Sequence, residues 1–339
     1  MEKRTAVVLF NLGGPDSLAA VRPFLYNLFS DPDIFTFPLG AVTQKFFAWL
    51  ISRRRAPEAS KGYAAMGGKS PLLENTQEQA IALQLALAME GAYDVFVCMR
   101  YWHPRADKVV TELKSKGYAR VVLLPLYPQY SKTTTGSSYN DFKRACERQH
   151  YQPKIIYITH WYDQDEYQQA IVSAIKSAAR AFSDPDPAKI EVLFSAHGLP
   201  KKIVEAGDIY EQHIRATYDA VCARLAWPRT TLCYQSRVGP LEWLRPYTDD
   251  VIREKAAAGV RQLLVYPIAF VSDHIETLYE LGREYAHLAE SLGISEYRVV
   301  PALNSDPRLI TALAQLVLEA VASQEKTTAD PTIQSATVT

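Results

Sequence analysis

The segment Glu191–Pro200 (EVLFSAHGLP), in the second half of the chain, resembles the segment Ala6–Pro15 (AVVLFNLGGP) near its start. Val121–Ser131 (VVLLPLYPQYS) similarly resembles Leu263–Asp273 (LLVYPIAFVSD). In each case a short apolar run gives way to a turn, which is typical of a buried strand and the loop after it. The pairing predicts two similar halves, although short buried strands also resemble one another by chance.

The rest of the chain extends this pattern, because short apolar runs alternate with longer segments of helical period, such as Thr76–Met89 and Gln164–Phe182. Such alternation predicts an α/β fold of two similar doubly wound, Rossmann- or flavodoxin-like domains. Each would have a parallel sheet flanked by helices, with the active-site cleft between the two domains. The predicted strands are Ala6–Leu12, Tyr93–Met99, Val121–Leu126, Ile155–Thr159, Glu191–Ser195, Thr230–Tyr234, Gln262–Pro267 and Tyr297–Val300.

The domain boundary is expected near Gln149–Lys154, where polar residues and Pro153 interrupt the pattern. Residues 1–152 would form the first domain, joined by a C-terminal helix at about 307–324. Residues 153–306 would form the second domain. Residues 325–339, rich in Thr, Ser and Ala, predict a disordered tail.

Composition narrows the class of protein. The 339 residues are 48% hydrophobic and 22% charged, as in a globular protein. Lys and Arg total 37, as do Asp and Glu, so the chain has no net positive charge that would attract nucleic acid. The N-terminal apolar run is too short for a signal peptide, and no run is long enough to cross a membrane. Four scattered cysteines disfavour a disulfide framework, a structural zinc site or an iron–sulfur cluster, and indicate the cytoplasm.

One segment breaks the symmetry of the halves. Phe24–Leu50, within a stretch of about 24–70, is unusually rich in aromatic and aliphatic residues, and Pro32 and Pro38 interrupt any single helix. Two interpretations stay open. The segment is either ordinary core, or an apolar lip over a large flat ligand that also offers a peripheral contact with a membrane surface.

Two groups of residues could carry chemistry. His197 ends a predicted strand, which is where ligands collect in an open α/β sheet. Asp273, Glu276 and Glu280 fall on one face of a helix that follows the equivalent strand, whereas His274 should point elsewhere. A structural histidine and a solvated acidic face are the alternatives. Together the two groups predict an open, transient site for divalent iron or zinc, because two strong ligands are too few for a closed structural site.

Two other segments give weaker signals. The loop Ser131–Ser138 follows a strand and could cradle a phosphate, but it lacks the ending of a P-loop. Arg100 and Tyr101 close another strand, and the nearby His103 is expected to be a packed loop residue.

The motifs around these residues resemble the ferrochelatase family over roughly Val7 to Leu316. The histidine signature corresponds to Leu193–Pro200 with Gly207, Asp208 and Tyr210, and the acidic helix corresponds to Ser272–Glu280. Further matches in the same order are Asn11–Pro15, Pro128–Ser131, Gln235–Pro240 and Trp243–Leu244. The resemblance implies a lyase of haem biosynthesis that inserts ferrous iron into protoporphyrin IX and releases two protons. A chelatase for another metal or another tetrapyrrole such as coproporphyrin III, and a non-catalytic porphyrin or haem carrier, are the alternatives.

The resemblance also implies residue roles. His197 and Glu276 would be the catalytic and metal-binding pair, supported by Asp273, His274 and Glu280. Porphyrin and Fe²⁺ would be substrates, with no permanently bound cofactor and no [2Fe–2S] cluster, since no cysteine follows Cys233. The oligomeric state stays open. The residues that match porphyrin-binding positions are Arg55, Tyr63, Ser70, Arg100, Tyr101 and Trp243.

Overall fold

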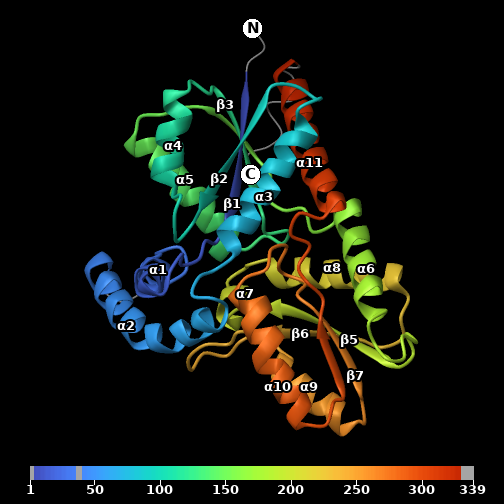
Figure 1. Cartoon of the computed structure of the whole chain (residues 1–339). Coiled ribbons are helices and arrows are strands. Elements are labelled where there is room, and N and C mark those ends of the chain that lie inside the picture. The colour runs from blue at the N-terminus through green and yellow to red at the C-terminus, as the bar shows by residue number, and fades with distance from the viewer. Residues whose placement is uncertain (1–3, 36–39, 330–339) are drawn as a thin grey trace.

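Two parallel four-stranded sheets organise the chain (Figure 1). The structure is a computed structural model that describes residues 4–35 and 40–329. The first sheet has the order β2-β1-β3-β4 and the second the order β6-β5-β7-β8. The strands are β1 (Thr5–Asn11), β2 (Tyr93–Met99), β3 (Arg120–Pro125), β4 (Lys154–Tyr157), β5 (Ile190–His197), β6 (Thr230–Gln235), β7 (Gln262–Tyr266) and β8 (Glu296–Val299).

All eight predicted strands are present, and the predicted equivalence of the two halves is confirmed. β1 and β5 hold the same place in their sheets, as do β3 and β7, and every pairing is parallel. The α/β fold class is therefore correct. The domain boundary near residue 152 stays a prediction.

The helices cover both faces of each sheet, which explains why the central strands are apolar on both sides. Ala6, Val8 and Phe10 of β1 pack against α4 and α5, whereas Val7 and Leu9 face α3 and α11. The helices are α1 (Val21–Phe29), α2 (Ala41–Ala65), α3 (Leu72–Leu87), α4 (Ala106–Ser115), α5 (Ser137–Arg148), α6 (Asp165–Ala179), α7 (Lys201–Glu205), α8 (Tyr210–Leu225), α9 (Thr248–Ala257), α10 (Tyr285–Ser291) and α11 (Pro307–Ala329).

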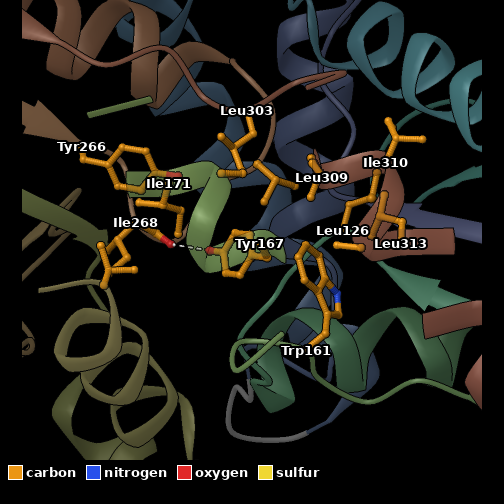
Figure 2. Packing of buried hydrophobic residues seen from close by; sticks show 14 of the residues in the cluster. Leu126, Trp161, Tyr167, Ile171, Tyr266, Ile268, Leu303, Leu309, Ile310 and Leu313 are labelled. Carbon is orange, nitrogen blue, oxygen red and sulfur yellow. Dashed lines mark hydrogen bonds between the residues drawn. The ribbon is translucent and has the colours of Figure 1, made fainter. Parts of the chain in front are cut away.

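The halves share one hydrophobic core. Figure 2 shows Trp161 and Tyr167 at its centre, with Ile268 of the second half on one side and Leu313 of α11 on the other. The rings of Trp161 and Tyr167 meet edge to face with centroids 4.9 Å apart, and the Tyr167 hydroxyl donates to the Ile268 carbonyl at 3.3 Å. Helix α11 lies beside both α3 and α6, so the end of the chain stabilises the junction of the halves (Figure 1).

Two sequence predictions about flexible or irregular segments need correction. Helix α11 continues to Ala329, so residues 325–329 are helical and do not belong to the predicted tail. Residues 330–339 lie outside the described residues.

The segment about 24–70 is neither all core nor all lip. Phe24 and Phe29 of α1 are buried, whereas Phe46 and Trp49 of α2 are 58% and 42% exposed.

Part of the α1–α2 connection cannot be compared with the prediction, because Pro38 lies outside the described residues. Pro32 does separate the two helices, as expected from its missing N–H. Among residues 4–35 and 40–329, no helix is both long enough and apolar enough to cross a membrane.

A buried histidine connects the halves and gives the first testable prediction. His213 of α8 accepts a hydrogen bond at Nδ1 from the backbone N–H of Tyr130, which follows β3. Burial, assisted by the neighbouring His160, lowers the pKa of His213 to about 4. An unfolded histidine titrates near 6.5, so between about pH 6.5 and pH 4 the unfolded state binds more protons than the folded state. The free energy of unfolding must therefore decrease as the pH is lowered through this range.

Replacing His213 with asparagine should weaken this pH dependence, since the amide oxygen accepts the same hydrogen bond but does not titrate. We expect the melting temperature of the His213→Asn variant to fall less than that of the wild type between pH 7 and pH 4.5. The exposed His287 provides the control. An unchanged slope in His213→Asn, or an equal change in His287→Asn, would show that His213 is not the responsible group.

Candidate active site

His197 is the last residue of β5 and lies beside the end of β6. The next residue, Gly198, lies where no side chain would fit. A Cβ on Gly198 would lie 2.8 Å from the Gln235 carbonyl oxygen and 3.2 Å from the Trp243 ring. Its own N–H donates to that carbonyl at 2.8 Å. Close approach of the two strand ends therefore fixes the backbone on which His197 sits.

Glu276 begins a helical segment, Glu276–Glu284, that follows the loop after β7. This segment is a π-helix, not the α-helix that the sequence predicted. π-Helical turns are rare and occur frequently at functional sites. Glu276 and Glu280 both face the ends of β5 and β6, so the predicted pairing of these two acids holds despite the different helix type.

One carboxylate oxygen lies between two imidazoles. Glu276 Oε2 is 4.0 Å from His197 Nε2 and 3.9 Å from His274 Nε2. The side chain of His197 is 37% exposed, that of Glu276 21% and that of His274 7%. The group therefore extends from the protein surface inward, with Glu276 in the middle.

The orientation of His274 corrects the expectation that it points elsewhere. Its Nδ1 lies 3.1 Å from the Ser272 carbonyl oxygen, to which only a protonated nitrogen can donate. In the neutral ring, Nε2 then carries a lone pair that faces Glu276. A lone pair facing a carboxylate at 3.9 Å is unfavourable unless a proton or a cation lies between the two groups. His274 and Glu276 therefore form a pair that is ready to hold either one.

The surroundings favour uncharged side chains. Burial lowers the pKa of His197 and of His274 and raises the pKa of Glu276. Burial, with the nearby Glu276 as the second cause, raises the pKa of Glu280 to about 7. A divalent cation can bind the lone pair of a neutral imidazole and displace the proton of a protonated acid. This cluster can therefore exchange protons for a metal ion.

Asp273 does not join the acidic row, contrary to the prediction. It precedes the π-helix, and its carboxylate accepts from the Thr277 hydroxyl at 2.8 Å and from the Asn304 amide at 2.9 Å. These bonds hold the loop before the helix against the loop after β8. Asp273 therefore supports the site through the backbone and not as a neighbour of Glu276.

Aromatic side chains and helix α2 border the histidine and the acids. The His197 ring lies 6.2 Å from the Trp243 ring and 6.5 Å from the Phe270 ring. From the first half, Tyr63 of α2 comes near enough that burial and Glu276 together raise its pKa. A Cβ on Gly62 would lie 3.0 Å from the Ile275 side chain, so glycine lets α2 pack against the start of the π-helix.

Three residues predicted to contact a porphyrin are instead engaged inside the protein. The Arg100 guanidinium pairs with Asp31 at 2.8 Å, and the Tyr101 hydroxyl donates to the same carboxylate at 2.6 Å. Ser70 is 7% exposed and its hydroxyl accepts from the Leu72 N–H. In this conformation these side chains are not available to a ligand. Arg55, by contrast, is exposed on α2.

The weaker signals have structural explanations. The Asp208 carboxylate from the second half accepts from the Ser131 hydroxyl at 2.9 Å and from the Lys132 N–H at 2.7 Å. The predicted phosphate cradle is therefore filled by the protein's own anion. His103 lies in the loop after β2 with its ring edge to face against Trp102, but it is exposed and not packed as the sequence predicted.

Two polar residues that the sequence did not single out contact the acids. Gln235 ends β6 and Ser236 follows it, and both donate to Glu280. Both residues lie in the Gln235–Pro240 motif. No local sequence pattern predicts that Ser236 adopts the left-handed conformation that brings it to Glu280.

A closed metal site is not formed. Among residues 4–35 and 40–329, no group of three or more His, Cys, Asp and Glu side chains could hold a metal ion. The open site predicted at His197 and Glu276, in which a substrate would complete the coordination, stays a prediction. Chemically, the arrangement can bind a divalent cation briefly and take up protons as the cation leaves.

A family model and several known proteins show what this chain is similar to. The family model "Ferrochelatase" matches residues 4–321. A ferrochelatase from Synechococcus sp. (strain JA-3-3Ab) is 51% identical over 93% of this chain and 93% of its own length. One from Aquifex aeolicus (strain VF5) is 47% identical over 93% and 98%. The solved structure "SirB from Bacillus subtilis with Fe3+" covers 95% of this chain and 98% of its own, with a TM-score of 0.57 and 11% identity, which supports the fold alone.

Proposed function

The chain belongs to the ferrochelatase family and inserts ferrous iron into a porphyrin, and we propose that His197 and Glu276 form the pair that receives this iron. The observation that carries the proposal is the 4.0 Å separation of His197 Nε2 and Glu276 Oε2. Two metal–ligand bonds of about 2.0–2.2 Å together match or slightly exceed this separation, so one ion fits between the two atoms without a closing movement.

The reaction exchanges one divalent cation for two protons. The two pyrrole N–H bonds of the porphyrin break, iron forms bonds to the nitrogens, and two protons are released. When iron moves from the pair to the porphyrin, His197 and Glu276 each regain a lone pair that can accept one of these protons. The exchange leaves the charge of the site unchanged, which matters because buried charge is costly there.

The protons then need a path away from the porphyrin. The low pKa of His197 and its partly exposed ring favour release of its proton to water. Glu276 faces the lone pair of His274 at 3.9 Å and could pass its proton to that side. His274 and Glu280 thus act as supports of the reacting pair.

We propose that the porphyrin lies between α2 and the edge formed by His197 and Trp243. The Trp243 ring beside His197 offers an apolar wall, whereas Tyr63 of α2 is 4% exposed and would contact the ligand only after becoming uncovered. Arg55, exposed on α2, would pair with a propionate. A macrocycle gripped in this way can be bent from planarity, which exposes nitrogen lone pairs to the incoming iron.

The natural porphyrin is proposed to be protoporphyrin IX. The test mixes purified protein anaerobically with Fe²⁺ and either protoporphyrin IX or coproporphyrin III, and follows the Soret band. Faster metallation of protoporphyrin IX supports the assignment, whereas faster metallation of coproporphyrin III reverses it. Tight binding of both porphyrins without metallation would indicate a carrier.

We further propose that the protein works in the cytoplasm without a resident cofactor. The cysteines Cys98, Cys146, Cys222 and Cys233 are free thiols, and at least three of them are buried. Free thiols are typical of a reducing compartment. Iron is then a substrate that enters and leaves as part of haem.

The outer face of α2 supports a peripheral membrane contact. Phe46, Trp49 and Leu50 are 58%, 42% and 43% exposed there. Arg22 and Arg53 place their guanidinium groups 5.8 Å and 5.6 Å from the Trp49 ring. Exposed apolar groups ringed by cations are typical of helices that lie on anionic lipid surfaces.

This contact predicts lipid-dependent binding. We expect the wild-type protein to cosediment with vesicles that contain anionic lipids, and the Phe46→Ser/Trp49→Ser variant to lose at least about 10-fold in affinity because two apolar side chains no longer enter the lipid. The variant Ile81→Ser/Leu85→Ser, which changes exposed apolar residues of α3, is the control. Equal binding by all three proteins would rule out the proposed contact.

A further inference from the structure

Ser236 adopts a backbone conformation that serine rarely takes. It follows β6 directly and has φ of +64°, in the left-handed region that favours glycine. Such a residue persists where its surroundings compensate for the strain, and such positions cluster at functional sites. In this structure the compensation comes from the acids of the π-helix.

Both polar groups of Ser236 bind Glu280. Its N–H donates to Glu280 Oε1 at 2.9 Å, and its hydroxyl donates to Glu280 Oε2. The left-handed turn is what aims the N–H and the hydroxyl at one carboxylate. The same hydroxyl is also 3.4 Å from Glu276 Oε2, so Ser236 lies between the two acids.

Glu280 is held by further donors, whereas Glu276 is not. The Gln235 amide donates to Glu280 Oε2 at 3.3 Å, and the Tyr285 hydroxyl donates to Oε1 at 3.2 Å. Among the described residues, the Glu276 carboxylate has only the Ser236 hydroxyl as a side-chain donor, at 3.4 Å, and the single proton of that hydroxyl is directed to Glu280. The two neighbouring acids therefore differ: one is fixed on both oxygens and the other is free to move toward a cation.

A buried chain of hydrogen bonds orients the Gln235 amide so that its NH₂ group faces the acids. The Ser195 hydroxyl donates to Gln235 Oε1 at 2.7 Å and is itself 2.9 Å from the Thr248 hydroxyl. All three side chains are buried. With its oxygen engaged by Ser195, Gln235 must present its NH₂ group to the acids, because the flipped amide would place oxygen against carboxylate.

We propose that Ser236, aided by Gln235, is a positioning residue that locks Glu280 in place so that Glu276 alone moves to bind iron with His197. Without the lock, the two carboxylates could swing together toward the same cation and hold it too tightly or in the wrong place. Ser236 does not touch the porphyrin in this account. The inference rests on the assignment of Glu276 as an iron ligand.

The test separates the hydroxyl from the backbone. Ser236→Gly keeps the left-handed turn and the N–H but removes the hydroxyl. We expect kcat/KM for Fe²⁺ to fall by about 10-fold, the upper end of the effect of losing one hydrogen bond. The KM for porphyrin should stay at the wild-type value, and the melting temperature should not fall, since glycine tolerates the turn.

Ser236→Ala keeps the strain and also lacks the hydroxyl. It should match the kinetics of Ser236→Gly but melt at a lower temperature. Wild-type iron kinetics in Ser236→Gly, or an equal rise of both KM values, would overturn the proposal. Glu276→Gln is measured alongside: if that variant keeps normal turnover, the iron-site assignment fails first, independently of Ser236.

Discussion

Replacing Glu276 with glutamine is expected to lower the rate of iron insertion by at least about 100-fold, the usual effect of losing a group that transfers protons or binds the metal. Glutamine has nearly the same shape, so packing against His197 and His274 should survive. It carries no negative charge and accepts no proton, so the exchange of iron for protons fails. Haem formation from Fe²⁺ and porphyrin, followed anaerobically by the Soret band, measures the loss.

Porphyrin binding by this variant should remain within about 3-fold of wild type, because the loss concerns the reacting centre and not the surface that grips the macrocycle. Quenching of porphyrin fluorescence gives the affinity. Glu290→Gln, the same substitution at an exposed site on α10, should behave as wild type. Normal turnover in Glu276→Gln, or loss of activity together with porphyrin affinity, would contradict the assigned role.

His197→Ala is expected to cause a loss of similar size, about 100-fold or more, since one of two iron ligands and one proton acceptor disappear together. The fold should tolerate the change because the side chain is 37% exposed. The same exposure allows a sharper test. Imidazole added to the solution should enter the vacated space and restore part of the activity of His197→Ala.

The control for this variant is His287→Ala, which removes a histidine that is 82% exposed on α10. It should keep full activity, and imidazole should leave its rate unchanged. If His197→Ala turned over normally, β5 would carry a structural histidine and the iron would have to bind elsewhere.

Much of this site follows from the sequence because its position depends on strand order. The similarity of Glu191–Pro200 to Ala6–Pro15 and of Leu263–Asp273 to Val121–Ser131 correctly predicted equivalent strands in two sheets. Strands β5 and β7 are adjacent and parallel, so the residues that follow them meet at one edge. That rule alone brings His197 near Glu276, whatever the helix type.

The details that the sequence missed depend on long-range contacts. Helical spacing predicted that Asp273 would join the acids and that His274 would point away. The bonds of Asp273 to Thr277 and Asn304, and the bond from His274 to the Ser272 carbonyl, reverse both predictions. The left-handed turn at Ser236 is accompanied by two hydrogen bonds to Glu280, which lies 44 residues further along the chain. Arg100 matched a ligand-binding position, yet its pairing with Asp31 depends on how α1 is placed.

The central claim is that iron first binds between His197 and Glu276. Crystals soaked anaerobically with Fe²⁺ and measured at the iron absorption edge test it most directly, because anomalous scattering locates the metal itself. The account predicts a peak about 2.0–2.2 Å from both His197 Nε2 and Glu276 Oε2. An ordered iron bound by other side chains, with no peak between these two atoms, would contradict it.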